Sequence, residues 1–172
     1  MKLIIRQETK NDFNIVYNVV KSAFKAAEHS DGDEHNLVNR LRESKNFIPQ
    51  LSLVAENKNE IIGHILFTKV TINKKTSLAL APVAVIPQYQ DKGVGSGLIL
   101  EGHNIAKNLG FSSVVVLGHP RYYPKFGYQP ASNWNIKPPF DVPDDCFMAI
   151  ELVHNGLKGV SGTVLYPEEF FI

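Results

Sequence analysis

An apolar run that leads through a glycine-rich turn into an amphipathic helix restricts the fold of this chain more than any other feature. The run from Ser77 to Ile86 is apolar almost throughout, which is typical of a central strand. The turn lies at Gln90 to Gly97, and apolar side chains at helical spacing predict a helix from Gly93 to Leu109. Because α/β proteins bind anions where a buried strand leads into a helix, we predict an α/β fold with a pyrophosphate site at this turn.

Pro82 lies inside the apolar run, and Pro87 closes it. Proline has no N–H to donate to a sheet, so a central strand tolerates it only at a bulge or where the strand parts from a neighbour. Either arrangement leaves main-chain groups of this strand free for a ligand.

The remaining elements fill the chain without a repeat, a low-complexity tract or a linker, so residues 1–172 are predicted to form a single domain. Helical periodicity predicts two helices before the sheet, the first capped by Thr9 and ending near Lys25, the second ending before Phe47. The other expected strands are Leu3–Arg6, Leu51–Glu56, Glu60–Ile72 and Ser112–Leu117, with a hairpin turn at Asn57–Asn59. We interpret Asn133–Asp145, which contains Trp134 and Phe140, as an irregular wall beside the acceptor or a long turn.

Composition argues against several classes of protein. The formal net charge is +1, so no global field attracts nucleic acid or anionic lipid. The longest apolar run is far shorter than the roughly 20 residues that span a bilayer, and the first residues lack the apolar core of a signal peptide. Cys146 is the only cysteine. We therefore expect a cytoplasmic monomer or homodimer with no nucleic-acid or membrane partner.

The glycines narrow the choice of ligand by their spacing. A P-loop needs Lys-Ser or Lys-Thr after its last glycine, and none follows Gly97. A dinucleotide fingerprint that begins at Gly93 and Gly95 needs a glycine where Leu98 stands. Taken alone, the turn is equally well explained as a tight connection without a ligand.

The turn does not stand alone, because Gln90-x-x-Gly93-x-Gly95 after Val83–Pro87 resembles the acetyl-CoA signature of the GNAT superfamily, Gln/Arg-x-x-Gly-x-Gly/Ala. The segments Leu80–Val85, Val116–Pro120 and Tyr122–Tyr128 are similar to its YhbS-like subgroup. The resemblance implies a mixed, mostly antiparallel twisted sheet that is splayed at the cofactor site and flanked by helices. It also implies acetyl-CoA as co-substrate and no metal.

The same resemblance implies how acetyl-CoA is held. Its pantetheine arm pairs with the main chain of Val83, Ala84 and Val85, and the Val85 N–H bonds the thioester oxygen. The pyrophosphate lies on the turn, whose contributing residues are Gln90, Asp91, Lys92, Gly93, Val94, Gly95 and Ser96. Since these contacts come from the main chain, the Val94 side chain is expected to be replaceable, whereas Gly93 and Gly95 are not.

Acetyl transfer to an amine also needs a proton for the departing thiolate. Tyr123 stands where many family members carry a tyrosine ahead of Lys-x-Gly-aromatic, here Lys125–Tyr128, and is expected to be the acid; Tyr122 is the less favoured donor. A phenol with a pKa near 10 protonates a thiolate whose acid has a pKa near 8.5 at a small cost. Many members contact the cofactor through an asparagine where this chain has Val116, so His119 is a candidate to take over part of that contact.

Glu34, His64 and His119 are candidate general bases, although a helix-terminal acid, a buried core histidine and a solvated histidine explain them equally well. The acidic and histidine residues between Glu28 and His35 match neither an EF-hand loop nor a His-Glu-x-x-His helix, so we expect no metal site there.

These observations predict an acetyl-CoA-dependent N-acetyltransferase that acts on a primary amine of a small molecule or protein by direct transfer in a ternary complex. Two alternatives stay open: a catalytically silent acyl-CoA-binding module and a nucleotide-binding α/β protein.

Overall fold

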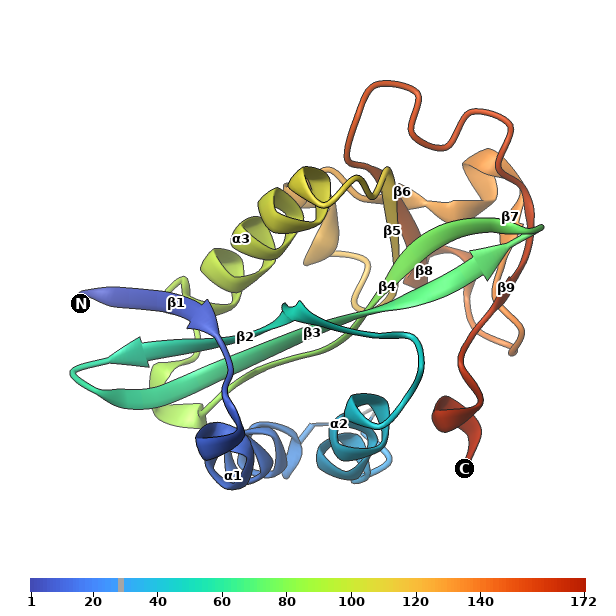
Figure 1. Ribbon diagram of the computed structural model, residues 1–172. Helices are drawn as coiled ribbons and strands as arrows, with labels where there is room; N and C mark the ends of the chain where they lie inside the picture. Colours follow the sequence, from blue (N-terminus) through green and yellow to red (C-terminus); the bar gives the residue numbers. More distant parts are fainter. Residues whose placement is uncertain (28–29) are drawn as a thin grey trace.

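A mixed β-sheet forms the centre of the computed structural model, which describes residues 1–27 and 30–172 (Figure 1). The strands are β1 (Leu3–Gln7), β2 (Phe47–Asn57), β3 (Glu60–Ile72), β4 (Lys75–Val85), β5 (Ser113–Leu117), β6 (Gln129–Pro130), β7 (Ile136–Lys137), β8 (Phe147–Glu151) and β9 (Gly162–Leu165). Their spatial order is β1-β2-β3-β4-β5-β8-β6, with β9 paired to β3 and β7. Only the β4–β5 and β7–β9 pairs are parallel, which confirms the expected mostly antiparallel sheet.

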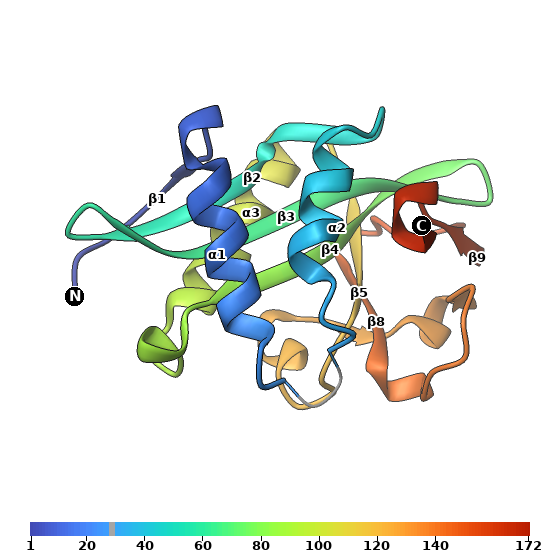
Figure 2. The same ribbon diagram turned by 90° about the horizontal axis from the view of Figure 1, so that it is seen from below.

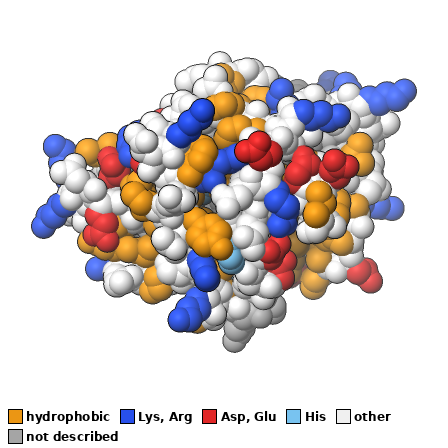
Figure 3. All heavy atoms as spheres, turned by 60° about the horizontal axis from the view of Figure 1, so that its bottom comes forward, with side chains coloured by type: hydrophobic (Ala, Val, Ile, Leu, Met, Phe, Trp, Pro, Cys, Tyr) orange, Lys and Arg blue, Asp and Glu red, His pale blue; other side chains and the backbone are white. Residues whose placement is uncertain are grey.

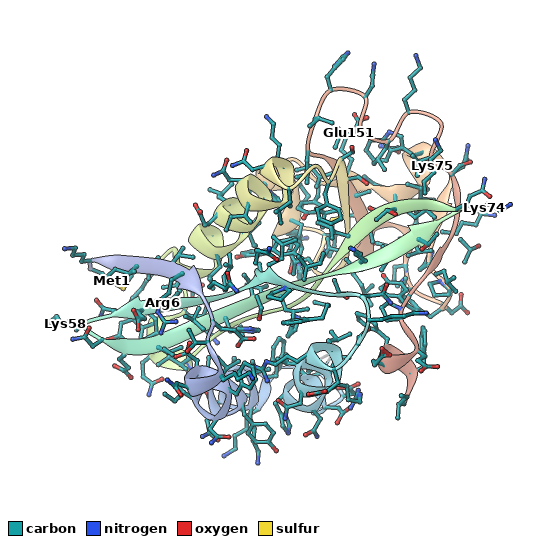
Figure 4. All side chains as sticks on the ribbon, in the orientation of Figure 1. Met1, Arg6, Lys58, Lys74, Lys75 and Glu151 are labelled. Carbon is teal, nitrogen blue, oxygen red and sulfur yellow. The ribbon has the colours of Figure 1, made fainter. Side chains whose placement is uncertain are left out.

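Two tight hairpins connect the long strands β2, β3 and β4. Lys58 and Asn59 have φ values of 50° and 65°, and Asn73 and Lys74 have φ values of 46° and 70°. Two consecutive residues with positive φ match the twist of antiparallel strands, so both hairpins are short. Lys58 and Lys74 lie at opposite tips of this three-stranded unit (Figure 4). The expected turn at Asn57–Asn59 is thereby confirmed.

Helices cover both faces of the sheet. α1 (Phe13–Phe24) and α2 (Glu34–Arg42) lie side by side on one face (Figure 2), and α3 (Val94–Asn108) lies on the other (Figure 1). The Thr9 N–H donates to Asp12 Oδ2 at 2.7 Å, which confirms the expected cap, although a short 3₁₀ turn precedes α1. None of the helices in the described ranges has both the length and the apolar composition for a membrane span.

Each helical layer buries its own apolar core. Ile65 and Phe67 of β3 pack against Leu98 of α3 in one cluster, and Val16 of α1 packs with Leu41 of α2 in another. These two cores fix the ends of α1 and α3 on opposite sides of β4. The position of any ligand beside β4 is therefore set by long-range packing.

One expected strand boundary is wrong, and one segment that is mostly irregular, as expected, contains a short strand. β2 begins at Phe47 instead of Leu51 and includes Pro49, because a register shift against β3 between Phe47 and Ser52 accommodates the proline. The segment Asn133–Asp145 contains β7, and its Trp134 and Phe140 pack on a third apolar core near β8 and β9.

Candidate active site

The carboxyl-terminal half of β4 has a sheet partner on one side only. Its pairing with β5 covers Leu78 and Ala79, whereas its pairing with β3 continues to Val85. Main-chain groups of β4 beyond Ala79 that point toward β5 therefore lie outside the described ladder. An extended ligand can bind such an edge as an additional strand would.

Pro82 lies at an irregularity in the same strand. Leu80 pairs with Phe67 and Val83 pairs with Ile65, so β4 contains one residue more than the facing part of β3. This arrangement is a β-bulge, and the Ala81–Pro82 peptide is cis. Both explanations for a proline in a buried strand, the bulge and the separation from a neighbour, are confirmed.

The turn after β4 supplies unpaired donors. Gly93 adopts φ 86° and ψ 5° as the N-cap of α3, a conformation that favours glycine. The first helical bond runs from the Gly97 N–H to the Gly93 carbonyl at 3.0 Å, so the three N–H groups between them precede the helical ladder. Gln90 Nε2 donates to the Val85 carbonyl at 2.9 Å and ties the turn to the strand edge. Donors at a helix N-terminus suit a phosphate group.

The side chains of the turn have different environments. Asp91 and Lys92 are exposed, and Lys92 Nζ lies 5.5 Å from the centre of the Tyr89 ring. Val94 is only 1% exposed and packs in the core between α3 and the sheet. The expectation that its side chain is replaceable is therefore wrong for stability, because the residue that offers a main-chain N–H also fills the core.

Gly95 lies against the hydroxyl of Tyr122. A Cβ added to Gly95 would meet Tyr122 Oη at 2.8 Å and Val85 Cγ2 at 3.8 Å. The half-buried Tyr122 hydrogen-bonds to the Ser96 side chain, and Lys125 Nζ lies 4.2 Å from the centre of its ring. Burial raises the pKa of the Tyr122 phenol, and the bond to Ser96 opposes that rise. The structure thus brings a protonated hydroxyl to the junction of the turn and the β4 edge.

Tyr123, the expected acid, points into the core. It is 7% exposed, and its ring packs edge-on against Tyr122 at 5.0 Å and Tyr128 at 5.6 Å between centroids. Its ring also lies so close to Gly118 that no side chain fits there. Burial raises the pKa of the Tyr123 phenol far above its ordinary value. The motif pointed to this pair of tyrosines, but no sequence signal showed which one reaches the turn.

A pocket of about 370 Å³ opens between the end of α1 and the β4 edge. Its lining comes from the last turn of α1 and the residues after it, from the end of β4 and from the turn: Ser22, Ala23, Phe24, Ala26, Ala27, Val83, Ala84, Val85, Pro87 and Gln90. The sequence analysis did not place the α1 residues in the site, because their pattern is that of an ordinary helix end.

None of the three candidate bases, Glu34, His64 and His119, lines this pocket. Glu34 begins α2 and accepts hydrogen bonds from Ser30 Oγ at 2.7 and 2.8 Å. His64 is fully buried, with Nε2 3.0 Å from Ser52 Oγ and 3.6 Å from Glu8 Oε2. Desolvation lowers the pKa of His64 to about 4, so its imidazole is neutral at pH 7. The structure therefore gives His64, which pairs with Ala84 in the β3–β4 ladder, a place in a buried polar cluster with no exposed surface.

Val116, which stands where many family members have an asparagine, and His119 lie near the end of β5 and just after it. Val116 is 2% exposed within the core, and His119 is exposed, with its Nδ1 accepting the Arg121 N–H at 3.1 Å. That bond leaves Nε2 of the neutral ring as the donor that can contact a ligand.

The charged side chains of the described residues form no metal site. Among the residues that the structure describes, no group of His, Cys, Asp and Glu side chains is arranged to hold a metal; Glu28 and His29 lie outside them. On the visible described surface of the face that carries α1 and α2, acidic and basic side chains are interspersed (Figure 3). The arrangement around β4 is therefore suited to an extended, phosphate-bearing ligand.

Known proteins are similar to this chain in sequence and in overall structure. The model of the Acetyltransferase (GNAT) family matches residues 13–128. The sequence is 36% identical over 147 residues to the protein named N-acetyltransferase YjhQ of Escherichia coli, which covers 81% of this chain and 78% of that protein. The structure is similar to the GNAT family N-acetyltransferase YhbS from Escherichia coli in complex with CoA, with a TM-score of 0.86, 28% identity and coverage of 99% and 92%. A GNAT family acetyltransferase from Brucella melitensis in complex with acetyl-CoA gives a TM-score of 0.82, 30% identity and 98% coverage of both chains.

Proposed function

Because this chain belongs to the GNAT family of acetyltransferases, we propose that it transfers an acetyl group from acetyl-CoA to a primary amine of a small molecule or a protein. The observation that carries the proposal is the free edge of β4 beside the N-terminus of α3. The complexes of YhbS with CoA and of the Brucella protein with acetyl-CoA support the choice of donor.

The residues present fit acetyl-CoA. The amides of its pantetheine arm match the main-chain groups of Val83–Val85, and its pyrophosphate matches the N–H groups from Asp91 to Ser96. Gly93 supplies the left-handed backbone that starts α3, and Gln90 holds the turn against the strand. The exposed His119 is placed in this proposal as a further polar contact from the connection after β5.

In the proposed reaction the amine nitrogen forms a bond to the acyl carbon, the carbon–sulfur bond breaks, and the thiolate of CoA takes up a proton. The Val85 N–H is proposed to stabilise the charge that develops on the acyl oxygen. We propose Tyr122 as the proton donor instead of the neighbouring Tyr123, because the Tyr122 hydroxyl contacts Gly95 and Ser96, whereas the Tyr123 ring is enclosed in the core.

The amine loses a proton before or during attack. Of the three candidate bases, His64 has no exposed surface and His119 is assigned to the cofactor, so the proposal gives this role to Glu34 acting through water. The rate is then expected to rise with pH toward the pKa of the acceptor amine, because the neutral amine is the nucleophile.

The deciding experiment measures CoA release from acetyl-CoA over a panel of small amines and peptides. The wild type is compared with Tyr122→Phe and Tyr123→Phe, which differ only in which of two adjacent hydroxyls is removed. A loss of kcat of about 10²-fold or more for Tyr122→Phe alone supports the assignment. A loss confined to Tyr123→Phe returns the role to that residue.

The silent acyl-CoA-binding module is the alternative function, and the enclosed position of His64 favours it by removing one candidate base. It predicts tight acetyl-CoA binding with no CoA release on any amine. Calorimetry with CoA, ATP and NAD distinguishes the acetyltransferase and the silent module from a nucleotide-binding protein. A nucleotide-binding protein would bind ATP or NAD and not CoA.

A further inference from the structure

The pocket beside Val85 has an uncharged and mostly apolar lining. None of its ten lining residues is acidic or basic, and only Ser22 and Gln90 carry a polar side chain. Gln90 is engaged with the Val85 carbonyl, and Ser22 Oγ donates to the Val19 carbonyl at 3.0 Å. The side chains offered to a ligand are therefore mostly apolar, and none of those that line the pocket carries a charge.

Alanines create much of the space. Ala84 projects from β4 and is 2% exposed, and Ala23 of α1 packs against the same core cluster. Ala26 and Ala27 follow α1 and line the outer part of the pocket. Four small side chains around one pocket leave the space between α1 and the β4 edge unfilled, and a larger side chain at Ala23 or Ala84 would fill it.

The chemistry of the lining residues distinguishes two candidate ligands for this pocket, the acceptor amine and the acyl chain of the donor. An ammonium group needs acceptors for its charge and a base for its proton, and the described lining offers only the Ser22 hydroxyl and the Gln90 amide among its side chains, with no carboxylate and no imidazole. An alkyl chain needs only apolar contact, and Val85, the residue assigned to the thioester, is itself part of the lining. The pocket therefore suits the acyl chain.

We propose that this pocket is an acyl-chain site, and that the protein uses propionyl-CoA and butyryl-CoA as well as acetyl-CoA while rejecting acyl chains that end in a charge. The proposal rests on the proposed function, because the thioester must lie at Val85. Ala23 and Ala84 then set the length of chain that fits.

Calorimetry with a series of acyl-CoA thioesters tests the proposal without knowledge of the acceptor. Each methylene that enters the pocket is expected to lower Kd about fourfold, since burying a methylene is worth ~0.8 kcal/mol. Butyryl-CoA should bind about 15-fold more tightly than acetyl-CoA. Succinyl-CoA has the same number of chain carbons but ends in a carboxylate, so it should bind at least ~10-fold more weakly than butyryl-CoA.

Ala23→Leu is the informative variant, and Asn18→Leu is its control. Both add a leucine to α1, but Asn18 is exposed and outside the lining. Ala23→Leu should abolish the preference for butyryl-CoA and leave the Kd for acetyl-CoA within about twofold, and Asn18→Leu should preserve the wild-type series. Ala84→Val provides a second pocket-filling change if Ala23→Leu folds poorly.

The outcomes distinguish a failure of the acyl-chain site from a failure of the proposed acetyltransferase function. If acetyl-CoA binds and the longer thioesters bind equally or more weakly in the wild type, the acyl-chain site is refuted and the acetyltransferase assignment stands. Equal affinity for succinyl-CoA and butyryl-CoA refutes it as well. If no CoA thioester binds, the proposed function fails and the acyl-chain site fails with it.

Discussion

Replacing Gly95 by alanine tests whether the Tyr122 hydroxyl acts at the turn. The new Cβ would lie 2.8 Å from Tyr122 Oη, whereas ordinary van der Waals contacts begin at 3.4 Å. The hydroxyl must therefore move by about 0.6 Å, or the first turn of α3 must shift by a similar amount. Because Tyr122 bonds to Ser96, the displacement also weakens that hydrogen bond.

Stability is expected to change little. Gly95 lies inside α3, where alanine is favoured over glycine by about 0.5–1 kcal/mol. The weakened hydrogen bond removes about 0.5–1.5 kcal/mol, so the two effects nearly cancel. Activity is far more sensitive, because misplacing a reacting group by about 1 Å lowers a rate by as much as ~10²-fold. We expect Gly95→Ala to lower kcat by about 10- to 100-fold with a nearly unchanged Tm.

The assay is a double-mutant cycle in CoA release, with Tyr122→Phe as the second change. Removing the hydroxyl removes the close contact, so Gly95→Ala should lower kcat by less than about twofold in the Tyr122→Phe background. An equal loss in both backgrounds would refute the reasoning, because the alanine would then act on the bound acyl-CoA directly. Full activity of Gly95→Ala alone would refute it too.

Three further changes concern stability and are measured by urea unfolding. Asp12→Asn should lower the free energy of unfolding by about 1–2 kcal/mol at pH 7, because Asp12 accepts from Arg6 Nη1 at 2.8 Å. The bond to Arg6 lowers the pKa of Asp12 from 3.8 to about 2, so this difference should vanish as the pH falls from about 4 through 2. The pKa of His64 is lowered from 6.5 to about 4 in the folded protein, so the unfolded chain binds this proton at a higher pH and the free energy of unfolding decreases as the pH falls from 6.5 to 4. His64→Gln should remove this part of the pH dependence. Val94→Ala should cost about 1–3 kcal/mol by leaving a cavity in the core, whereas a freely replaceable side chain would cost almost nothing.

Local chemistry made several features readable from the sequence. The left-handed backbone at Gly93 favours a residue without a Cβ, and α3 starts directly after it. Pro82 cannot donate to a ladder, so an irregularity in β4 was required wherever the strand lay. The helix after the turn has its apolar residues at a regular spacing, and its observed bounds, Val94–Asn108, differ from the expected ones by one residue at each end.

Side-chain direction was not readable in the same way. Tyr122 and Tyr123 are identical and adjacent, and the 3₁₀ turn at Tyr123–Phe126 sends one ring to the turn at Gly95 and the other into the core. The same holds for His64, whose alternating position in β3 allowed either face until α1 and α2 packed over it.

The sequence by itself indicated where β4 is irregular and where α3 begins, because proline cannot donate to a ladder and glycine readily adopts the left-handed backbone that precedes the helix. Only the tertiary structure decided which hydroxyl meets Gly95 and which alanines border Val85. Those contacts join residues far apart in the chain, and they depend on how whole helices pack against a sheet instead of on any local preference.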